Sequence, residues 1–138
     1  MAPGCLKMKY EPISEELERI GKEIVDSAYR VHKELGPGLL ESVYEECMVY
    51  DLRRKGFKVE TQVCVPIEFD GQVLKRNKLR MDMLVEDQVV VENKAVVEMI
   101  PLFEAQTLTY LRLGKMRLGY LINYNVTLIR NGIKRFVV

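Results

Sequence analysis

Residues 89–95 read VVVENKA. This stretch begins with three apolar residues and then carries two charged ones, and it decides which fold we expect. Three β-branched residues in succession predict a strand, because such side chains pack well on a pleated sheet. Glu92 and Lys94 follow two positions apart, which places both side chains on one face of that strand. Charges on a buried strand are costly unless they are paired or bind a metal. The segment is therefore either a structural ion pair at a strand end or part of a charged site.

A second carboxylate, Asp82, favours the charged site. It interrupts a strand expected at about residues 79–86, and one hairpin separates it from Glu92. Antiparallel pairing of the two strands would bring both carboxylates close together. We expect Met81 and Met83 to point to the face opposite Asp82, because neighbouring residues of a strand alternate.

The connection between these strands decides whether the carboxylates meet. A two-residue turn at residues 87–88 would set Asp82 opposite Asn93, so that Asp82 and Glu92 would point to opposite faces. An odd-length loop or a β-bulge would place them on the same face. We expect the irregular connection, because bulges are common beside active sites.

Periodicity predicts the other elements. Apolar residues at helical spacing indicate two helices near the start, and alternation indicates strands after them. The expected elements are helices at residues 15–35 and 39–55, strands at 57–69, 72–75, 79–86 and 89–95, a helix at 101–114, and strands at 118–123 and 133–138. Asp70-Gly71 and Asn131-Gly132 are hairpin signals. This order is typical of an α/β sandwich around a mixed sheet.

Length and composition indicate one globular domain. The chain has 138 residues, 48% hydrophobic and 30% charged, which suffices for one compact core. We expect residues 1–12 to form a flexible N-terminal arm and residues 13–138 to form the single domain. The formal net charge is +1, so any nucleic-acid-binding surface must be local.

Cysteine and histidine contents limit the metal chemistry. The three cysteines are widely separated and odd in number, which favours a reducing, cytoplasmic setting. No segment reads as a signal peptide or a membrane span, so we expect no membrane association. A single histidine, His32, excludes zinc sites that need two, and we expect it to pack between helices. Any bound metal would be held by carboxylates, which favours Mg²⁺ or Mn²⁺.

Two helical pairs are further candidates. Glu41 and Tyr44 lie three residues apart at the start of the second helix, on adjoining surface. The alternative for Glu41 is a first-turn acid stabilised by the helix dipole. Gln106 and Tyr110 lie four apart on the third helix, where Gln106 is either a buried structural amide or a site residue.

A basic segment precedes Asp82. Four of the six residues 75–80 are basic, and they are candidates for contacts with a nucleic-acid backbone: Lys75, Arg76, Lys78 and Arg80. The alternative is a solvated hairpin tip.

Taken in order, these elements resemble the GxxExxY protein family of the PD-(D/E)XK nuclease superfamily. The resemblance covers about residues 20–138 and begins with VHKELGPGLLESVY at residues 31–44, which holds the Gly, Glu and Tyr of the family name. Asp82 and the triplet ENK at residues 92–94 are similar to the acidic core of the superfamily. QTLTY at residues 106–110 is similar to the Q-x-x-x-Y element of RecB-like exonucleases.

The resemblance implies a restriction-endonuclease-like three-layer sandwich, with a mixed central β-sheet flanked by helices. It also implies a metal-dependent nuclease or phosphodiesterase that cleaves DNA or RNA with Mg²⁺ or Mn²⁺. Lys94 would orient the attacking water or stabilise the transition state. The implied metal ligands are Asp82, Glu92, the backbone carbonyl of Asn93, and Glu41. The implied positioning residues are Gln106, Tyr110 and Tyr44.

Three positions depart from the family pattern. Met81 stands where the superfamily name has proline, Asn93 stands where an aliphatic residue is usual, and Phe103 stands where relatives have histidine. The last two motivate an alternative, a nucleic-acid-binding or protein-interaction module that keeps the fold without the activity. A homodimer that pairs through exposed apolar residues of the last strand, 133–138, is a further hypothesis.

Overall fold

The computed structural model describes residues 11–74, 76–77 and 79–138. Its elements are α2 (Glu15–Leu35), α3 (Glu41–Arg54), β1 (Val59–Cys64), β2 (Ile67–Phe69), β3 (Gln72–Leu74), β4 (Arg80–Val85), β5 (Val89–Lys94), α4 (Pro101–Gly114), β6 (Leu118–Asn123), the 3₁₀ helix η1 (Ile129–Asn131) and β7 (Ile133–Val137). Most of the expected N-terminal arm lies outside the described residues. The carbonyl oxygens of Glu11 and Pro12 accept hydrogen bonds from Arg117.

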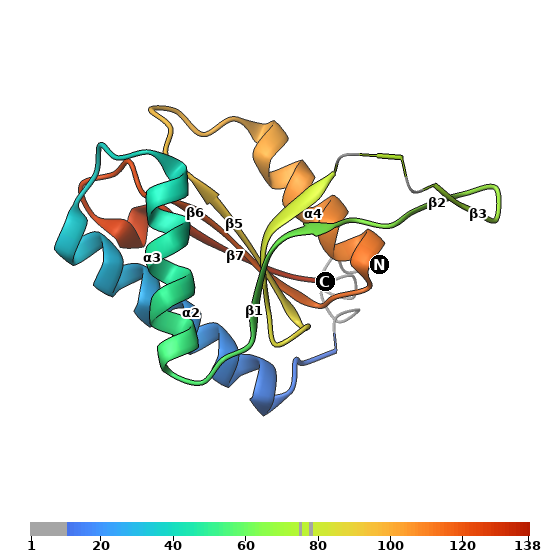
Figure 1. The fold of residues 1–138 in the computed structure, drawn as a ribbon, viewed down its shortest axis with the longest axis horizontal. Helices are drawn as coiled ribbons and strands as arrows, with labels where there is room; N and C mark the ends of the chain where they lie inside the picture. Colours follow the sequence, from blue (N-terminus) through green and yellow to red (C-terminus); the bar gives the residue numbers. More distant parts are fainter. Residues whose placement is uncertain (1–10, 75, 78) are drawn as a thin grey trace, which may run out of the picture.

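A mixed five-stranded sheet forms the middle layer, in the order β1-β4-β5-β6-β7. β5 and β6 are parallel, and the other neighbours are antiparallel. α2 and α3 cover one face of the sheet and α4 covers the other (Figure 1). This is the α/β sandwich that the sequence predicts. None of the described helices combines the length and the apolar composition needed to cross a bilayer.

The first helix begins and ends where its sequence signals predict. The Ser14 side chain accepts a hydrogen bond from the Leu17 N–H, which satisfies one of the free donors at the start of α2. Gly36 follows the last turn with φ 68°, a conformation that favours glycine, and its N–H bonds to the His32 carbonyl.

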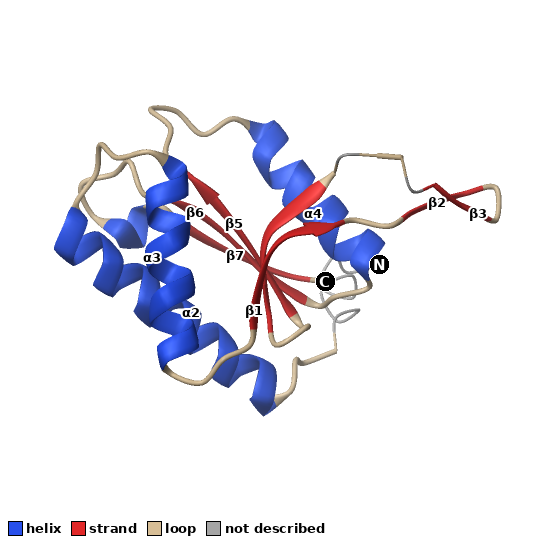
Figure 2. Cartoon of the chain, in the orientation of Figure 1, coloured by secondary structure: helices blue, strands red, loops and turns tan. Residues whose placement is uncertain are grey.

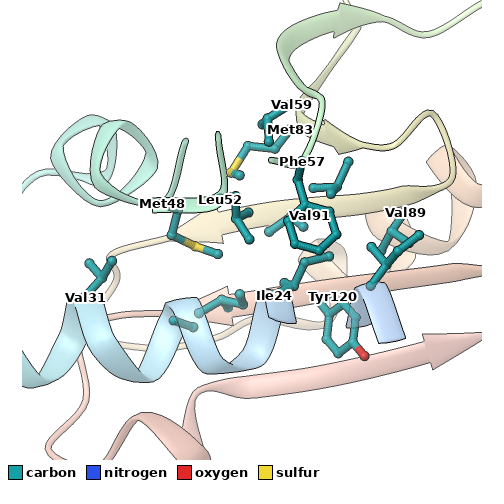
Figure 3. Packing of buried hydrophobic residues seen from close by; sticks show 14 of the residues in the cluster. Ile24, Val31, Met48, Leu52, Phe57, Val59, Met83, Val89, Val91 and Tyr120 are labelled. Carbon is teal, nitrogen blue, oxygen red and sulfur yellow. The ribbon is translucent and has the colours of Figure 1, made fainter. Parts of the chain in front are cut away.

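Two hydrophobic clusters fill the space between the layers. The larger one packs α2 and α3 on the sheet and includes Ile24, Leu52 and Val91 (Figure 3). Within it, the rings of Tyr44 and Tyr124 stack with centroids 4.4 Å apart. The smaller cluster lies under α4 and contains Val90, Leu111 and Leu121 among others. Successive valines of β5 therefore point to different layers, which explains why this strand is apolar on both faces.

The strand expected at residues 57–69 is wrong, because the chain leaves the sheet within it. β1 ends at Cys64 and β2 begins at Ile67, with Pro66 between them. Proline has no N–H to donate to a ladder, so it marks an end of pairing. β2 and β3 form a separate two-stranded sheet, an arm that extends away from the body (Figure 2).

The end of the chain also differs from the prediction. β6 and β7 do pair, but nine residues that include η1 connect them, and Gly132 has φ −100°, so Asn131-Gly132 is no tight hairpin turn. β7 is an edge strand, yet its exposed residues are Lys134 and Arg135, which pair with glutamates on helices. Phe136 is buried. Within residues 133–138, the segment that suggested a homodimer, Val138 is the one exposed large apolar residue, and the homodimer stays a hypothesis.

Tyr44 fixes the loop that leads into α3. Its buried hydroxyl donates to the Gly36 carbonyl at 2.6 Å and accepts a hydrogen bond from the Leu39 N–H at 3.1 Å. These two bonds close the loop between α2 and α3, and thereby set the position of Glu41, the first residue of α3.

Replacing Tyr44 with phenylalanine removes both hydrogen bonds while it keeps the ring stack. We expect the free energy of unfolding to fall by about 1–2 kcal/mol, measured by urea denaturation. Tyr50→Phe is the matched control, because Tyr50 lies on the same helix and is 69% exposed, and its stability should not change. Equal midpoints for the two variants would contradict this role of the Tyr44 hydroxyl.

Candidate active site

The β4–β5 hairpin has the odd-length connection that the sequence predicts. Val85 pairs with Val89 and Met83 pairs with Val91, so three residues, 86–88, make the turn. Glu86 and Asp87 both have positive φ. Extended by one pair beyond Met83 and Val91, this register sets Asp82 across from Glu92.

The two strands separate at this point. Regular pairing ends at Met83 and Val91, and beyond it β4 and β5 diverge (Figure 1). The Asp82 N–H donates to Glu92 Oε2, and the Asn93 N–H donates to Asp82 Oδ2, both at 2.9 Å. Each carboxylate therefore accepts a backbone hydrogen bond from the opposite strand. We call the opening between β4 and β5 at Asp82 and Glu92 the fork, and these reciprocal bonds hold both side chains in it.

β4 is irregular on its other side as well. Pairing with β1 is interrupted between Thr61–Met83 and Val63–Met81. Met81 and Met83 pack in different hydrophobic clusters, so the expectation that they share one face is wrong. Gln62, the residue across from Asp82 in this gap, has φ 51°. A positive φ is uncommon for a residue with a side chain and is found often at functional sites.

Burial makes the carboxylates of the fork hard to ionise. Glu92 is 6% exposed, and burial together with the neighbouring Asp82 raises its pKa to about 8, although the Asp82 N–H and Lys94 act in the opposite direction. Burial also raises the pKa of Asp82, against the opposing effects of the Asn93 N–H, Lys94 and Gln62. Neither carboxylate has an ion-pair partner among the described residues. One buried and one half-buried carboxylate, neither of them in an ion pair within this part of the chain, are suited to hold a cation.

Helix α3 brings two more carboxylates to the fork. Partial burial, and then Asp82, raise the pKa of Glu41 and of Glu45. The two glutamates lie one turn apart and line a pocket of about 360 Å³ together with Gln62 and Asp82. Gln62 Nε2 donates to Glu45 Oε1 at 3.2 Å, and its amide also lowers the pKa of Asp82.

Glu45 and Gln62 were missed by the sequence analysis. Glu45 carried a usable signal, because it follows Glu41 by four residues and like charges at this spacing are unfavourable on an isolated helix. Gln62 carried none. Its place beside Asp82 depends on the register of β1 and on its unusual backbone conformation.

Lys94 lies near the carboxylates without pairing to them. Its Nζ is 4.4 Å from the centroid of the Phe103 ring, and it lowers the pKa of Glu92, Asp82 and Glu41. The Glu92–Lys94 ion pair that was the alternative interpretation does not form within the described residues. The aromatic ring of α4 instead attracts the ammonium group by a cation–π interaction.

Helix α4 closes the other side of the fork. Tyr110 is buried, and burial raises the pKa of its hydroxyl. Glu92 and Asp82 raise this pKa further, because their negative charges disfavour a tyrosinate nearby. Gln106 is half-buried one turn earlier. Thr107 is buried, and its hydroxyl donates to the Phe103 carbonyl of the same helix.

Asn93 has two separate environments. Its N–H points to β4, and because the N–H and C=O of one strand residue point to the same side, its carbonyl also faces the fork. Its side chain lies on the other face, buried, with Nδ2 3.2 Å from Met83 Sδ and with no partner for Oδ1 among the described residues. Only the backbone of Asn93 therefore reaches the site.

The remaining candidates lie apart from the fork. The His32 Nε2–H donates to the Val126 carbonyl at 2.8 Å, a packing role. Arg80 is exposed and bonds to the carbonyls of Asn77 and Leu79, and Arg76 is exposed. Lys75 and Lys78 lie outside the described residues.

The donor set fits a hard cation that keeps part of its water shell. Among the described residues, no three His, Cys, Asp or Glu side chains converge closely enough to hold a metal by themselves. The fork offers two carboxylates and one carbonyl, all oxygen donors. Mg²⁺ commonly binds one or two carboxylates and completes its shell with water and substrate phosphates.

Comparison with known families identified a superfamily for this chain. The sequence model of a family described as the PD-(D/E)XK nuclease superfamily matches residues 18–136, nearly the whole described chain. No curated protein and no solved structure matched. The three-layer fold agrees with the restriction-endonuclease-like architecture expected from the resemblance.

The raised pKa of Glu92 predicts how the stability of the metal-free protein depends on pH. Between 4.5, the ordinary pKa of glutamate, and about 8, the unfolded chain has released a proton that the folded chain retains. Stability is therefore lost as the pH rises through this range. Glu92→Gln keeps an oxygen for the Asp82 N–H and has no proton to lose. In urea denaturation with a chelator, we expect it to exceed wild type by about 2–4 kcal/mol near pH 9 and by little near pH 4.

Glu98→Gln is the control for the loss of a negative charge, because Glu98 is exposed, and it should differ little from wild type throughout this range. A gap between Glu92→Gln and wild type that stays constant with pH would contradict the buried, protonated state of Glu92.

Proposed function

The chain belongs to the PD-(D/E)XK nuclease superfamily, and we propose that it is a divalent-metal-dependent nuclease that hydrolyses phosphodiester bonds of DNA or RNA through Asp82, Glu92 and Lys94. Nucleases of this superfamily generally use divalent metals. The observation that carries the proposal is the reciprocal hydrogen bonding of Asp82 and Glu92 in the fork, which fixes a half-buried and a buried carboxylate side by side.

Mg²⁺ or Mn²⁺ would be held by the Asp82 and Glu92 carboxylates and the Asn93 carbonyl, with Glu41 contributing through water. The chemistry that such a cation supplies is to neutralise charge on the phosphate and to make a neighbouring water more acidic. The backbone bonds use one oxygen of each carboxylate and fix the position of both groups, so the second oxygen of each would be available to the cation.

Lys94 would act on the substrate. An ammonium that is not paired with a carboxylate is free to donate to a phosphate oxygen or to orient the attacking water. The Phe103 ring keeps Nζ at the side of the fork that α4 covers. Tyr110 and Gln106, on the same helix, would hold the scissile phosphate or its water, and Tyr44 would act indirectly by fixing the loop before Glu41.

A non-catalytic nucleic-acid-binding module is the second candidate. The contact between Lys94 and Phe103 favours it, because an aromatic ring attracts the ammonium away from a reacting phosphate. Metal-dependent turnover distinguishes the two functions.

Cleavage of labelled single- and double-stranded DNA and RNA in Mg²⁺ or Mn²⁺ tests the proposal. We expect Asp82→Asn and Glu92→Gln to lower the cleavage rate by about three orders of magnitude, because each removes a charge that holds the cation. Glu98→Gln is the matched control and should cleave as wild type does. Absence of cleavage of every substrate, or equal cleavage by Asp82→Asn, would refute the catalytic proposal and leave the binding module.

A substitution of Gln62 tests its role in activity separately from its role in stability. Gln62→Gly removes the amide beside Asp82 and Glu45 but relieves the positive φ, so we expect cleavage to fall about 10- to 100-fold without loss of stability. Asp87→Gly is the control, because Asp87 also has a positive φ but lies in the turn away from the fork, and it should cleave normally. Normal cleavage by Gln62→Gly would show that the amide does not position Asp82.

A further inference from the structure

A second surface has the composition of a polyanion site. A groove of about 590 Å³ runs between the last turns of α2 and the segment around η1, which lie side by side (Figure 1). Tyr29, Arg30 and Lys33 line it from α2, and Leu128 and Arg130 line it from the other side. The hydrogen bond from His32 to the Val126 carbonyl joins α2 to the segment that leads into η1.

The charged residues that line this groove are all cationic, and none of the described lining residues is acidic. Lys33 and Arg130 form no ion pair with any other described residue, so both charges are free to bind an anion. Arg30 lines this groove and also a second groove between α2 and α3, where it pairs with Asp51. Glu34, Glu46 and Asp51 line the second groove, so its charge is mixed.

The groove also offers apolar and aromatic surface. Tyr29 is 44% exposed and Leu128 is 49% exposed. Tyr29 and Lys33 lie four residues apart on α2, so their side chains are neighbours on one helix face. Cationic side chains interleaved with an exposed aromatic ring are typical of surfaces that bind single strands, whose base faces are available for stacking. A duplex hides those faces.

The groove lies near the carboxyl ends of β5 and β6, the same end of the sheet as the candidate active site. The segment that forms its outer wall leaves the sheet beside Lys94, where the Tyr124 N–H bonds to the Lys94 carbonyl. The other wall, α2, is joined to Glu41 by the five residues 36–40, which span at most about 20 Å. The end of α2 and Glu41 are therefore close enough for one extended nucleic-acid strand to reach from one to the other.

We propose that this groove binds a single-stranded stretch of nucleic acid, with phosphates on Lys33 and Arg130 and a base stacked on Tyr29. The inference deepens the proposed nuclease function and rests on it for the identity of the polyanion. The pocket beside the fork is lined by Glu41, Glu45 and Asp82 and by no cationic residue of the described chain, so cations outside the fork would add to the attraction of Lys94 for a phosphate backbone.

Binding without cleavage tests the groove separately from the catalytic site. The full chain is titrated in a chelator against a fluorescein-labelled oligothymidylate of about twenty nucleotides, and anisotropy is followed between about 50 and 200 mM salt. Lys33→Glu/Arg130→Glu should weaken binding at least about tenfold and lower the salt slope by about 1.4, the value for two lost phosphate contacts on a single strand.

Lys22→Glu/Lys58→Glu is the control, because it changes the net charge equally at exposed positions outside the groove and the fork. It should bind close to wild type. Equal weakening in the two double variants would overturn the proposal, because only net charge would then matter.

Tyr29 supplies a variant that leaves the charge unchanged. Tyr29→Ala should weaken binding to the oligothymidylate at least about fivefold, and Tyr29→Phe should restore it, because the ring alone stacks. A labelled duplex should be insensitive to Tyr29→Ala. Wild-type affinity of Tyr29→Ala for the single strand, or equal loss on the duplex, would refute the single-strand assignment. Cleavage does not enter these readouts, so a groove that binds in a protein that does not cleave would contradict only the nuclease proposal.

Discussion

Two backbone N–H groups, those of Asp82 and Asn93, donate to carboxylates where a regular sheet would have them donate to carbonyls. The rest of the site depends on this exchange. It stands where regular pairing of β4 with β5 ends, and it holds the Asp82 and Glu92 side chains next to each other. The three-residue turn at 86–88 makes the exchange possible, because an even-length connection would place the two carboxylates on opposite faces.

Such a fork destabilises the protein that contains it, and the surrounding structure compensates. Desolvation dominates the pKa of both carboxylates, which means that folding pushes them toward the protonated form. The stabilising part of the fold lies directly beside them. Val89, Val90 and Val91 are fully buried between the two helical layers, and the Tyr44–Tyr124 stack anchors the loop before α3. Functional sites often carry this kind of local cost, which a bound ligand or metal relieves.

The sequence was most informative about the turn between β4 and β5, because the alternation of side chains along a strand determines which turn lengths bring two carboxylates to one face. A carboxylate on each of two adjacent strands required an odd-length turn, and that prediction is confirmed. It was least informative where long-range register decides. Alternation continued through Val65 and beyond, so the strand break at Pro66 was overlooked although proline itself was the signal. Nothing in the sequence around Gln62 distinguishes it from any other surface glutamine. Its place beside Asp82 follows from the interrupted pairing of β1 with β4. Cationic residues 97 positions apart, Lys33 and Arg130, share one groove for the same reason.

The central claim is that Asp82 and Glu92 converge on a single divalent cation. A crystal structure determined with Mn²⁺, with the metal located by its anomalous scattering, tests it most directly. We expect one peak within coordination distance of both carboxylates and of the Asn93 carbonyl. A peak bound elsewhere, or a fork that stays empty while Mn²⁺ occupies other sites, would contradict the account.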